Sequence, residues 1–316
     1  MVKRAGGVTI IKEIALAGIA ILLLGGANSW CDENSLSTLL CAQMRKSLFE
    51  GVIHKVEVSG QEMDFSRIEP YLPRDDTVFS IFYLRLTSAP RQEFLYVPIR
   101  MPAASMIKVF ILGAAMEKVQ TGALNLQDAV ILCDEDKVGG AGILIEYAAG
   151  TEFSIEELLT LMITESDNTA TNILIDRLGM EEINQYITHA GYEDTILQRK
   201  MMDFDAAEQG RENYTSVRDL GRFFTNLYDQ KCVAPVYDAK MIKILKGQSD
   251  TEGIPRGVPE AVVAHKTGEL LHIYHDGGII YGVQDSVLVI MTAHYHSREE
   301  TIEAVNQIAS VLVHEE

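Results

Sequence analysis

A serine and a lysine stand three residues apart at the start of an apolar segment, as Ser105 and Lys108 in the run SMIKVFILGAA. Residues three apart lie on one face of a helix, so this spacing places an amine beside a hydroxyl. A serine hydroxyl becomes a useful nucleophile when a neighbouring base removes its proton. Because the surrounding residues are apolar, burial would favour a neutral lysine that can act as this base. The pair therefore predicts nucleophilic catalysis by Ser105.

The start of a helix adds a second part of the same chemistry. The first N–H groups of a helix have no partner within it, and they carry a partial positive charge. The N–H of Ser105 can therefore help to stabilise the oxyanion that forms when its hydroxyl attacks a carbonyl. Taken alone, Ser-x-x-Lys is a weak signal, because surface helices contain it by chance.

Two further motifs follow in the chain. Ser166-Asp167-Asn168 comes after an apolar segment predicted to be helical, and Lys266-Thr267-Gly268 closes the predicted strand AVVAHKTG. Each motif alone would be an ordinary helix cap or strand end. In this order and on these elements, they complete the three-part signature of class A β-lactamases and penicillin-binding proteins. From about residue 50 to the C-terminus, the chain resembles this family of penicillin-recognising serine hydrolases, to which D,D-peptidases are related.

The resemblance implies an acylation mechanism. Ser105 attacks the substrate carbonyl and becomes acylated, Lys108 takes part in its deprotonation, and Ser166 passes a proton toward the leaving nitrogen. The implied partner is a β-lactam or a small molecule resembling D-Ala-D-Ala. No cofactor or metal is expected, because the cysteine and histidine spacings do not resemble a metal site.

The resemblance also implies how the substrate is held. Asn168 contacts its amide side chain, and Lys266 supports Ser166 and attracts its carboxylate. Thr267 hydrogen-bonds that carboxylate, Gly268 lets the strand approach closely, and the N–H of Glu269 completes the oxyanion hole.

The sequence departs from the family at the step that releases the acyl group. Class A β-lactamases use a glutamate on the loop after SDN to activate the water that hydrolyses the acyl-enzyme. Counting along this chain places that position at Met201 or Met202. We therefore expect β-lactam hydrolysis, with a slowly deacylating D,D-carboxypeptidase or penicillin-binding protein as the alternative. A non-catalytic β-lactam sensor or binding domain is the alternative from another class.

Charged and titratable residues lie near the position of the missing glutamate and after the KTG motif. The acidic residues near Met201 could supply a carboxylate, but we interpret them as solvated loop acids: Asp203, Asp205 and Glu208. Arg199 and Glu212 bracket the same stretch and could close it as an ion pair. After KTG, where the family often has a carboxylate-binding arginine, this chain has His272 and His275, which we interpret as strand-end residues.

The hydrophobic pattern predicts an α/β (α+β) fold, with an antiparallel sheet built from both ends of the chain, flanking helices and an inserted all-α lobe. The resemblance implies that this is the β-lactamase-like fold. We expect an α/β lobe from about 31–104 and 230–316, and a helical lobe from about 105–229. The predicted strands are Val52–Val58, Thr77–Leu86, Glu93–Ile99, Ala261–Thr267, Gly277–Tyr281 and Ser286–Ala293. The predicted helices are Ser35–Glu50, Ser105–Gln120, Ser154–Ile163, Ser216–Tyr228 and Arg298–His314.

The N-terminus and the composition indicate the location of the protein and limit its possible partners. Residues 1–30 read as a signal peptide or N-terminal anchor, since a basic start precedes the apolar run Ile14–Ala27. The domain at 31–316 is then exported, and it contacts a membrane only if that segment stays uncleaved. The net charge of −18 argues against nucleic acid as a partner. Four cysteines permit disulfides or free thiols, and the sequence carries no signal for an oligomeric state: Cys31, Cys41, Cys133 and Cys232.

Overall fold

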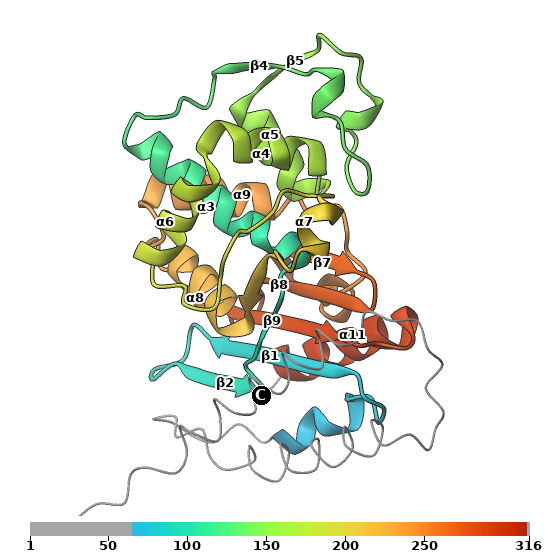
Figure 1. Ribbon diagram of the computed structural model, residues 1–316. Helices are drawn as coiled ribbons and strands as arrows, with labels where there is room; N and C mark the ends of the chain where they lie inside the picture. Colours follow the sequence, from blue (N-terminus) through green and yellow to red (C-terminus); the bar gives the residue numbers. More distant parts are fainter. Residues whose placement is uncertain (1–64, 315–316) are drawn as a thin grey trace, which may run out of the picture. The chain divides into compact units, whose positions relative to one another are not determined.

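A five-stranded antiparallel sheet forms the base of the domain in the computed structural model, which describes residues 65–314 (Figure 1). Its order is β2-β1-β9-β8-β7, so strands from both ends of the described chain pair side by side. The strands are β1 (Val78–Arg85), β2 (Gln92–Tyr96), β7 (Val262–Leu270), β8 (Ile273–Tyr281) and β9 (Ser286–Ala293). The predicted antiparallel sheet is therefore confirmed.

Both faces of this sheet are covered, which explains why β9 is buried along its whole length. Successive side chains of a strand point to opposite faces. Accordingly, Leu288 and Ile290 pack with helix α11 (Arg298–Val313), whereas Val287 and Val289 pack with the helices of the other face. On that other face, α8 (Val217–Tyr228) lies directly against the sheet.

The short helix α10 (Ile254–Gly257) packs with α11, and the other helices lie beyond α8 in Figure 1, together with two short two-stranded sheets, β3 with β6 and β4 with β5. Helix α3 is buried from its first residue to Met116, because it is apolar all round and lies among the other helices. The helices are α3 (Lys108–Gln120), α4 (Ile155–Thr164), α5 (Asn168–Leu178), α6 (Met180–His189), α7 (Phe204–Glu208), α9 (Pro235–Leu245) and α10 (Ile254–Gly257). The short strands are β3 (Arg100–Pro102), β4 (Ala129–Ile131), β5 (Glu152–Ser154) and β6 (Tyr214–Ser216).

The short 3₁₀ turns complete the description: η1 (Phe65–Arg67), η2 (Glu69–Tyr71), η3 (Ala104–Ile107), η4 (Asp134–Asp136) and η5 (Leu144–Glu146). Ser154 begins α4 with a capping box, since its side chain and that of Glu157 satisfy each other's backbone N–H groups. Several predicted bounds are wrong: β8 begins at Ile273 rather than Gly277, and β2 ends at Tyr96 rather than Ile99. The α-helix expected from Ser105 begins at Lys108 after a 3₁₀ turn, and the strand that KTG was expected to close continues to Leu270.

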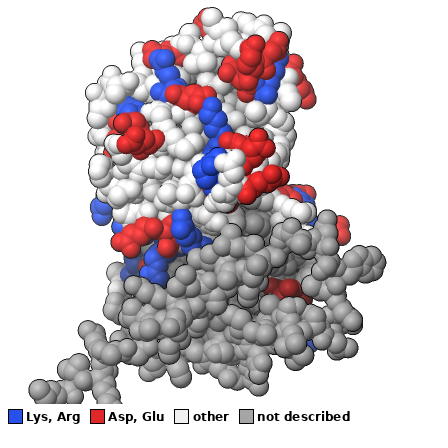
Figure 2. All heavy atoms as spheres, viewed as in Figure 1, with Lys and Arg blue, Asp and Glu red and all other residues white. Residues whose placement is uncertain are grey.

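Several predictions concern residues outside those described: the export segment, the helix Ser35–Glu50, the strand Val52–Val58, Cys31 and Cys41. Within 65–314, no helix has the length and apolar character to cross a bilayer, and Cys133 and Cys232 are free thiols. The domain boundaries, export and cleavage stay predictions. On the described part of the face in Figure 2, acidic and basic side chains lie in small mixed groups.

Candidate active site

Ser105 lies in the 3₁₀ turn η3, between strand β3 and the buried helix α3. Met106 and Ile107 anchor this turn in the core, while Ser105 itself is half-buried. Ala104 has a φ of +46°, a left-handed conformation that non-glycine residues seldom adopt, so the backbone is strained next to the serine. Residues three apart also align in a 3₁₀ turn, so the predicted proximity of Ser105 and Lys108 survives the corrected helix start.

Lys108 is fully buried and lies at the centre of a polar cluster. Its Nζ is 2.6 Å from the Ser166 carbonyl oxygen, 2.9 Å from Asn168 Oδ1 and 3.2 Å from Ser166 Oγ. Burial, and then the charge of Lys266, hold the pKa of Lys108 well below its usual value. A neutral amine has two hydrogens for the two carbonyl-type oxygens and keeps its lone pair for a hydroxyl.

Among the described residues, the hydrogen bonds of this amine do not include Ser105 Oγ. Catalytic hydrogen bonds are often long in a free enzyme and tighten only when substrate is bound. The hydroxyl of Ser105 must therefore approach Lys108 as the substrate complex forms.

Ser166 connects Lys108 to the second lysine of the site. Lys266 Nζ lies 3.1 Å from Ser166 Oγ and 2.7 Å from the carbonyl oxygen of Thr267. Burial lowers the pKa of Lys266 to about 7, although the charges of Asp250 and Asp276 oppose this change. A hydroxyl between two amines of lowered pKa can accept a proton from one side and donate on the other.

Asp167 explains how the SDN turn is fixed. It caps helix α5 through Oδ1, and its Oδ2 accepts hydrogen bonds from the N–H groups of Ile143 (2.7 Å) and Leu144 (2.8 Å). Gly142 has a φ of +115°, and a Cβ there would lie 2.3 Å from Asp167 Oδ2, so only glycine fits. The neighbouring residues Ser166 and Asn168 are thereby held toward Lys108.

Gly268 brings strand β7 against the nucleophile turn. A Cβ at this position would lie 3.1 Å from the backbone nitrogens of Ser105 and Met106, which is closer than most side chains tolerate. The carboxylate of the next residue, Glu269, forms an ion pair with Arg298 of α11, with Nε to Oε1 at 2.8 Å. The two predicted oxyanion donors, the N–H groups of Ser105 and Glu269, thus lie on the two segments that meet at Gly268.

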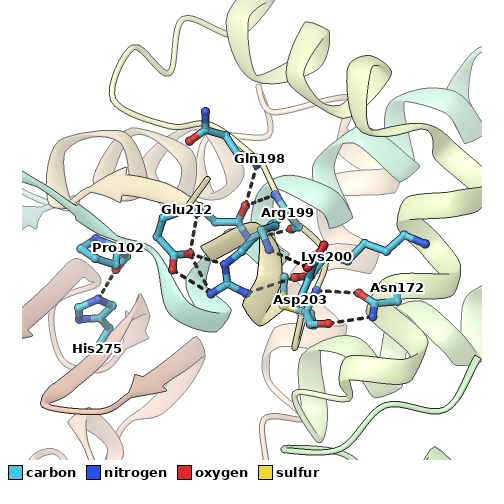
Figure 3. A network of polar contacts seen from close by, with 11 residues as sticks. Pro102, Asn172, Gln198, Arg199, Lys200, Asp203, Glu212 and His275 are labelled. Carbon is cyan, nitrogen blue, oxygen red and sulfur yellow. Dashed lines mark hydrogen bonds and ion pairs between the residues drawn. The ribbon is translucent and has the colours of Figure 1, made fainter. Parts of the chain in front are cut away.

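An ion pair joins the two ends of the loop at residues 199–212, as the sequence predicted. Arg199 Nε and Nη2 donate to the two carboxylate oxygens of Glu212, each over 2.9 Å (Figure 3). Asn213 Oδ1 also accepts from the backbone N–H groups of Gln198 and Arg199. Helix α7 lies inside this closed loop.

Asn172 of α5 bridges the backbone of Met201. The N–H of Met201 donates to Asn172 Oδ1 over 2.8 Å, and its carbonyl oxygen accepts from Asn172 Nδ2 over 3.1 Å (Figure 3). Asn172 follows Asn168 by one turn of α5, so both lie on one helix face. The bridge therefore holds the Met201 backbone one helical turn from Asn168, which contacts Lys108. The Met202 sulfur and the Asn168 amide both lie beside Gly140. The spacing of Asn168 and Asn172 was the sequence signal for this bridge.

The acids of this loop point to solvent. Asp203 is exposed and caps α7 by accepting from the N–H of Ala206 over 2.9 Å. Asp205 and Glu208 are also exposed. This agrees with their interpretation as solvated loop acids.

The two histidines after KTG have different surroundings. His272 is exposed in the β7–β8 turn, where its Nδ1 lies 2.9 Å from the carbonyl oxygen of Tyr295. His275 is fully buried, so the prediction that it is a strand-end residue is wrong. It lies inside β8, and its Nε2 is 2.9 Å from the Pro102 carbonyl oxygen.

Replacing Arg199 by alanine should lower the free energy of unfolding by about 3 kcal/mol, because it leaves the Glu212 carboxylate without its partner in a mostly buried place. The Arg199 side chain is only 10% exposed. Chemical denaturation would measure the change. Lys118→Ala, which breaks the more exposed pair with Glu182, serves as the control and should cost about 1 kcal/mol or less. Equal losses in the two variants would contradict this account of the loop.

The comparisons with known proteins agree with this geometry. Residues 69–315 match the model of the β-lactamase enzyme family. A β-lactamase of Streptomyces lavendulae is 24% identical over 230 residues, which cover 70% of this chain and 75% of that protein. The crystal structure of a β-lactamase from Sphaerobacter thermophilus is 25% identical, with a TM-score of 0.73 over 79% of this chain and 96% of that one.

A second solved structure is a point variant of PBP-A in an acyl-enzyme complex with penicillin G. It is 25% identical, with a TM-score of 0.69 over 90% of this chain and 97% of that one. The family match spans more than half of the chain, and the order of the motifs and their meeting in space are those of a serine hydrolase. The chain therefore belongs to the β-lactamase enzyme family.

Proposed function

We propose that this protein hydrolyses β-lactam amides through an acyl-enzyme on Ser105, and that hydrolysis of this acyl-enzyme is its slow step. The observation that carries the first half is the cluster in which Lys108, Ser166 and Lys266 share hydrogen bonds. It contains a buried amine of lowered pKa, as a general base requires, close to the serine turn.

In this proposal, Lys108 takes the proton of Ser105 as its oxygen attacks the amide carbonyl. The C–N bond then breaks, and Ser166 delivers a proton to the leaving nitrogen, with Lys266 restoring the proton to Ser166. The N–H groups of Ser105 and Glu269 hold the oxyanion. Lys266 and Thr267 hold the substrate carboxylate, and Asn168 holds its amide side chain.

The second half rests on the environment of Met201. A water that attacks the acyl-enzyme needs a base, and a thioether cannot accept its proton at neutral pH. The acids Asp203, Asp205 and Glu208 face solvent instead. Once the acyl group is on Ser105, Lys108 carries the proton that it took from the serine and must lose it before it can activate water, so release is slow.

The same observation favours a second candidate function, that of a D,D-peptidase acting on peptides that end in D-Ala-D-Ala. Such an enzyme uses the same acylation chemistry and is trapped by β-lactams because the acyl-enzyme persists. The likeness to PBP-A supports this candidate. Release of D-alanine from a peptide ending in D-Ala-D-Ala would support it.

A labelling experiment tests the proposed nucleophile. Purified protein should bind a fluorescent penicillin covalently, and tryptic mapping should place the label on the peptide that contains Ser105. Ser105→Ala should not be labelled, whereas Ser88→Ala, an exchange at a hydroxyl that donates to the Arg85 carbonyl oxygen, should be labelled normally. Equal labelling of wild-type protein and Ser105→Ala would refute the assignment.

A further inference from the structure

His275 is a buried titratable side chain that the proposed mechanism does not use. It lies on β8, opposite Gly268 of β7 on one side and Met291 of β9 on the other. Its Nε2 is 2.9 Å from the carbonyl oxygen of Pro102, 173 residues earlier in the chain (Figure 3). Pro102 ends strand β3 and is followed closely by the serine turn.

The hydrogen-bond network assigns the tautomer of this histidine. The N–H of Thr292 donates to Nδ1 over 3.1 Å, so Nδ1 acts as an acceptor. The Tyr274 carbonyl oxygen, which also lies near Nδ1, already accepts the hydroxyl of Thr292 over 2.8 Å. Burial lowers the pKa of His275 to about 4, so the ring is neutral and its one hydrogen is on Nε2. The Nε2–H group therefore donates to Pro102.

The Pro102 carbonyl is the one with which Ser105 would pair in a continuous 3₁₀ turn. Met106 N–H does make the corresponding bond, to the carbonyl of Ala103 over 3.0 Å. Within residues 65–314, however, the N–H of Ser105 makes no such bond to Pro102. His275 holds that carbonyl instead, and the Ser105 N–H is left for the oxyanion.

Gly268 acts on the same turn from the neighbouring strand, since it lies against the backbone nitrogens of Ser105 and Met106. Gly268 and His275 are paired across β7 and β8. The sheet thus contacts the serine turn at two adjacent points, one by close approach and one by a hydrogen bond.

We propose that His275 is a positioning residue for acylation: by holding the Pro102 carbonyl, it sets the serine turn against β7 and keeps the Ser105 N–H directed at the oxyanion. This rests on the proposed role of Ser105 as the acylated nucleophile. The histidine touches no substrate, so it should affect the acylation rate constant and leave the noncovalent affinity for the β-lactam nearly unchanged.

The test compares three substitutions by stopped-flow kinetics with benzylpenicillin. His275→Asn keeps an amide near the Nδ1 position but is too short to reach Pro102, whereas His275→Gln reaches the Nε2 position. We expect His275→Asn and His275→Leu to acylate about 30-fold more slowly. This slowing lies between the larger effect of losing an oxyanion donor and the smaller effect of losing one ordinary hydrogen bond. His275→Gln should acylate within about fivefold of wild type.

The control is Leu288→Ala, which weakens the core on the opposite face of the same sheet and has no contact with Pro102. It should lower the melting temperature without changing the acylation rate constant at a temperature where it is folded. If His275→Leu does not fold, the Asn and Gln variants carry the test. Equal rate constants for those two variants, or an equal slowing by Leu288→Ala, would overturn the proposal. An absence of acylation in wild-type protein would instead refute the role of Ser105.

Discussion

Replacing Lys108 by methionine should lower the rate constant for acylation of Ser105 by about 10³-fold, which is the usual effect of losing a general base. The methionine has a similar length and suits the buried position, so the loss reflects chemistry rather than unfolding. Intact-mass kinetics with benzylpenicillin would measure the rate constant, and thermal denaturation would verify folding. Lys118→Met, farther along the same helix and outside the polar cluster, should acylate like wild type.

The pH profile gives this prediction a second measurement. Wild-type acylation at limiting substrate should have a bell-shaped profile. It should fall on the acid side as Lys108 gains a proton, and on the alkaline side from about pH 7 as Lys266 loses the charge that attracts the substrate carboxylate. Lys108→Met should lose the acid limb and keep the alkaline one. Retention of both limbs would assign the base to another group.

Replacing Met201 by glutamate should raise the rate constant for deacylation by about 10²-fold, because it supplies a general base for the attacking water. The Met201 backbone is held on both sides by Asn172, and its side chain is only 8% exposed. Asn172 lies one helical turn from Asn168, which contacts Lys108, so a carboxylate at this position would enter the region of that amine. The charge that Lys108 gains with the Ser105 proton would favour the ionised carboxylate. The mass-spectrometric decay of a preformed penicillin adduct would measure the change.

Two matched variants make the Met201 prediction specific. Met201→Gln has the shape of the glutamate without its charge and should leave deacylation slow. Glu208→Gln removes an exposed acid from the same loop and should also leave it unchanged. If Glu208→Gln slowed deacylation strongly, that loop acid would be the water-activating base, and the account of Met201 would be wrong.

The sequence predicted much of the site because its motifs are local. Ser-x-x-Lys, SDN and KTG each place their residues within one turn or strand, and their order predicted that the three would meet. The Arg199–Glu212 pair also followed from spacing, and it is confirmed. The sheet followed from continuous apolar runs bounded by turn residues, such as Ser286–Ala293.

The parts that could not be predicted depend on tertiary contacts or on backbone conformation. The 3₁₀ turn at Ser105 includes the positive φ of Ala104, which alanine does not favour by itself. The contact of His275 with Pro102 joins residues 173 apart, so no local pattern indicates it. The count along the loop left Met201 and Met202 open, and the bridge from Asn172 to the Met201 backbone is a tertiary contact that no count shows.

The central claim is that Ser105 is acylated quickly and released slowly, and time-resolved intact-mass spectrometry with benzylpenicillin tests it most directly. A single measurement follows both the appearance and the loss of the adduct. We predict that the protein is fully converted to an adduct with the added mass of one penicillin molecule, and that this adduct then decays much more slowly than it formed. The account would be contradicted by complete turnover of the antibiotic without accumulation of any adduct, since release would then be faster than acylation.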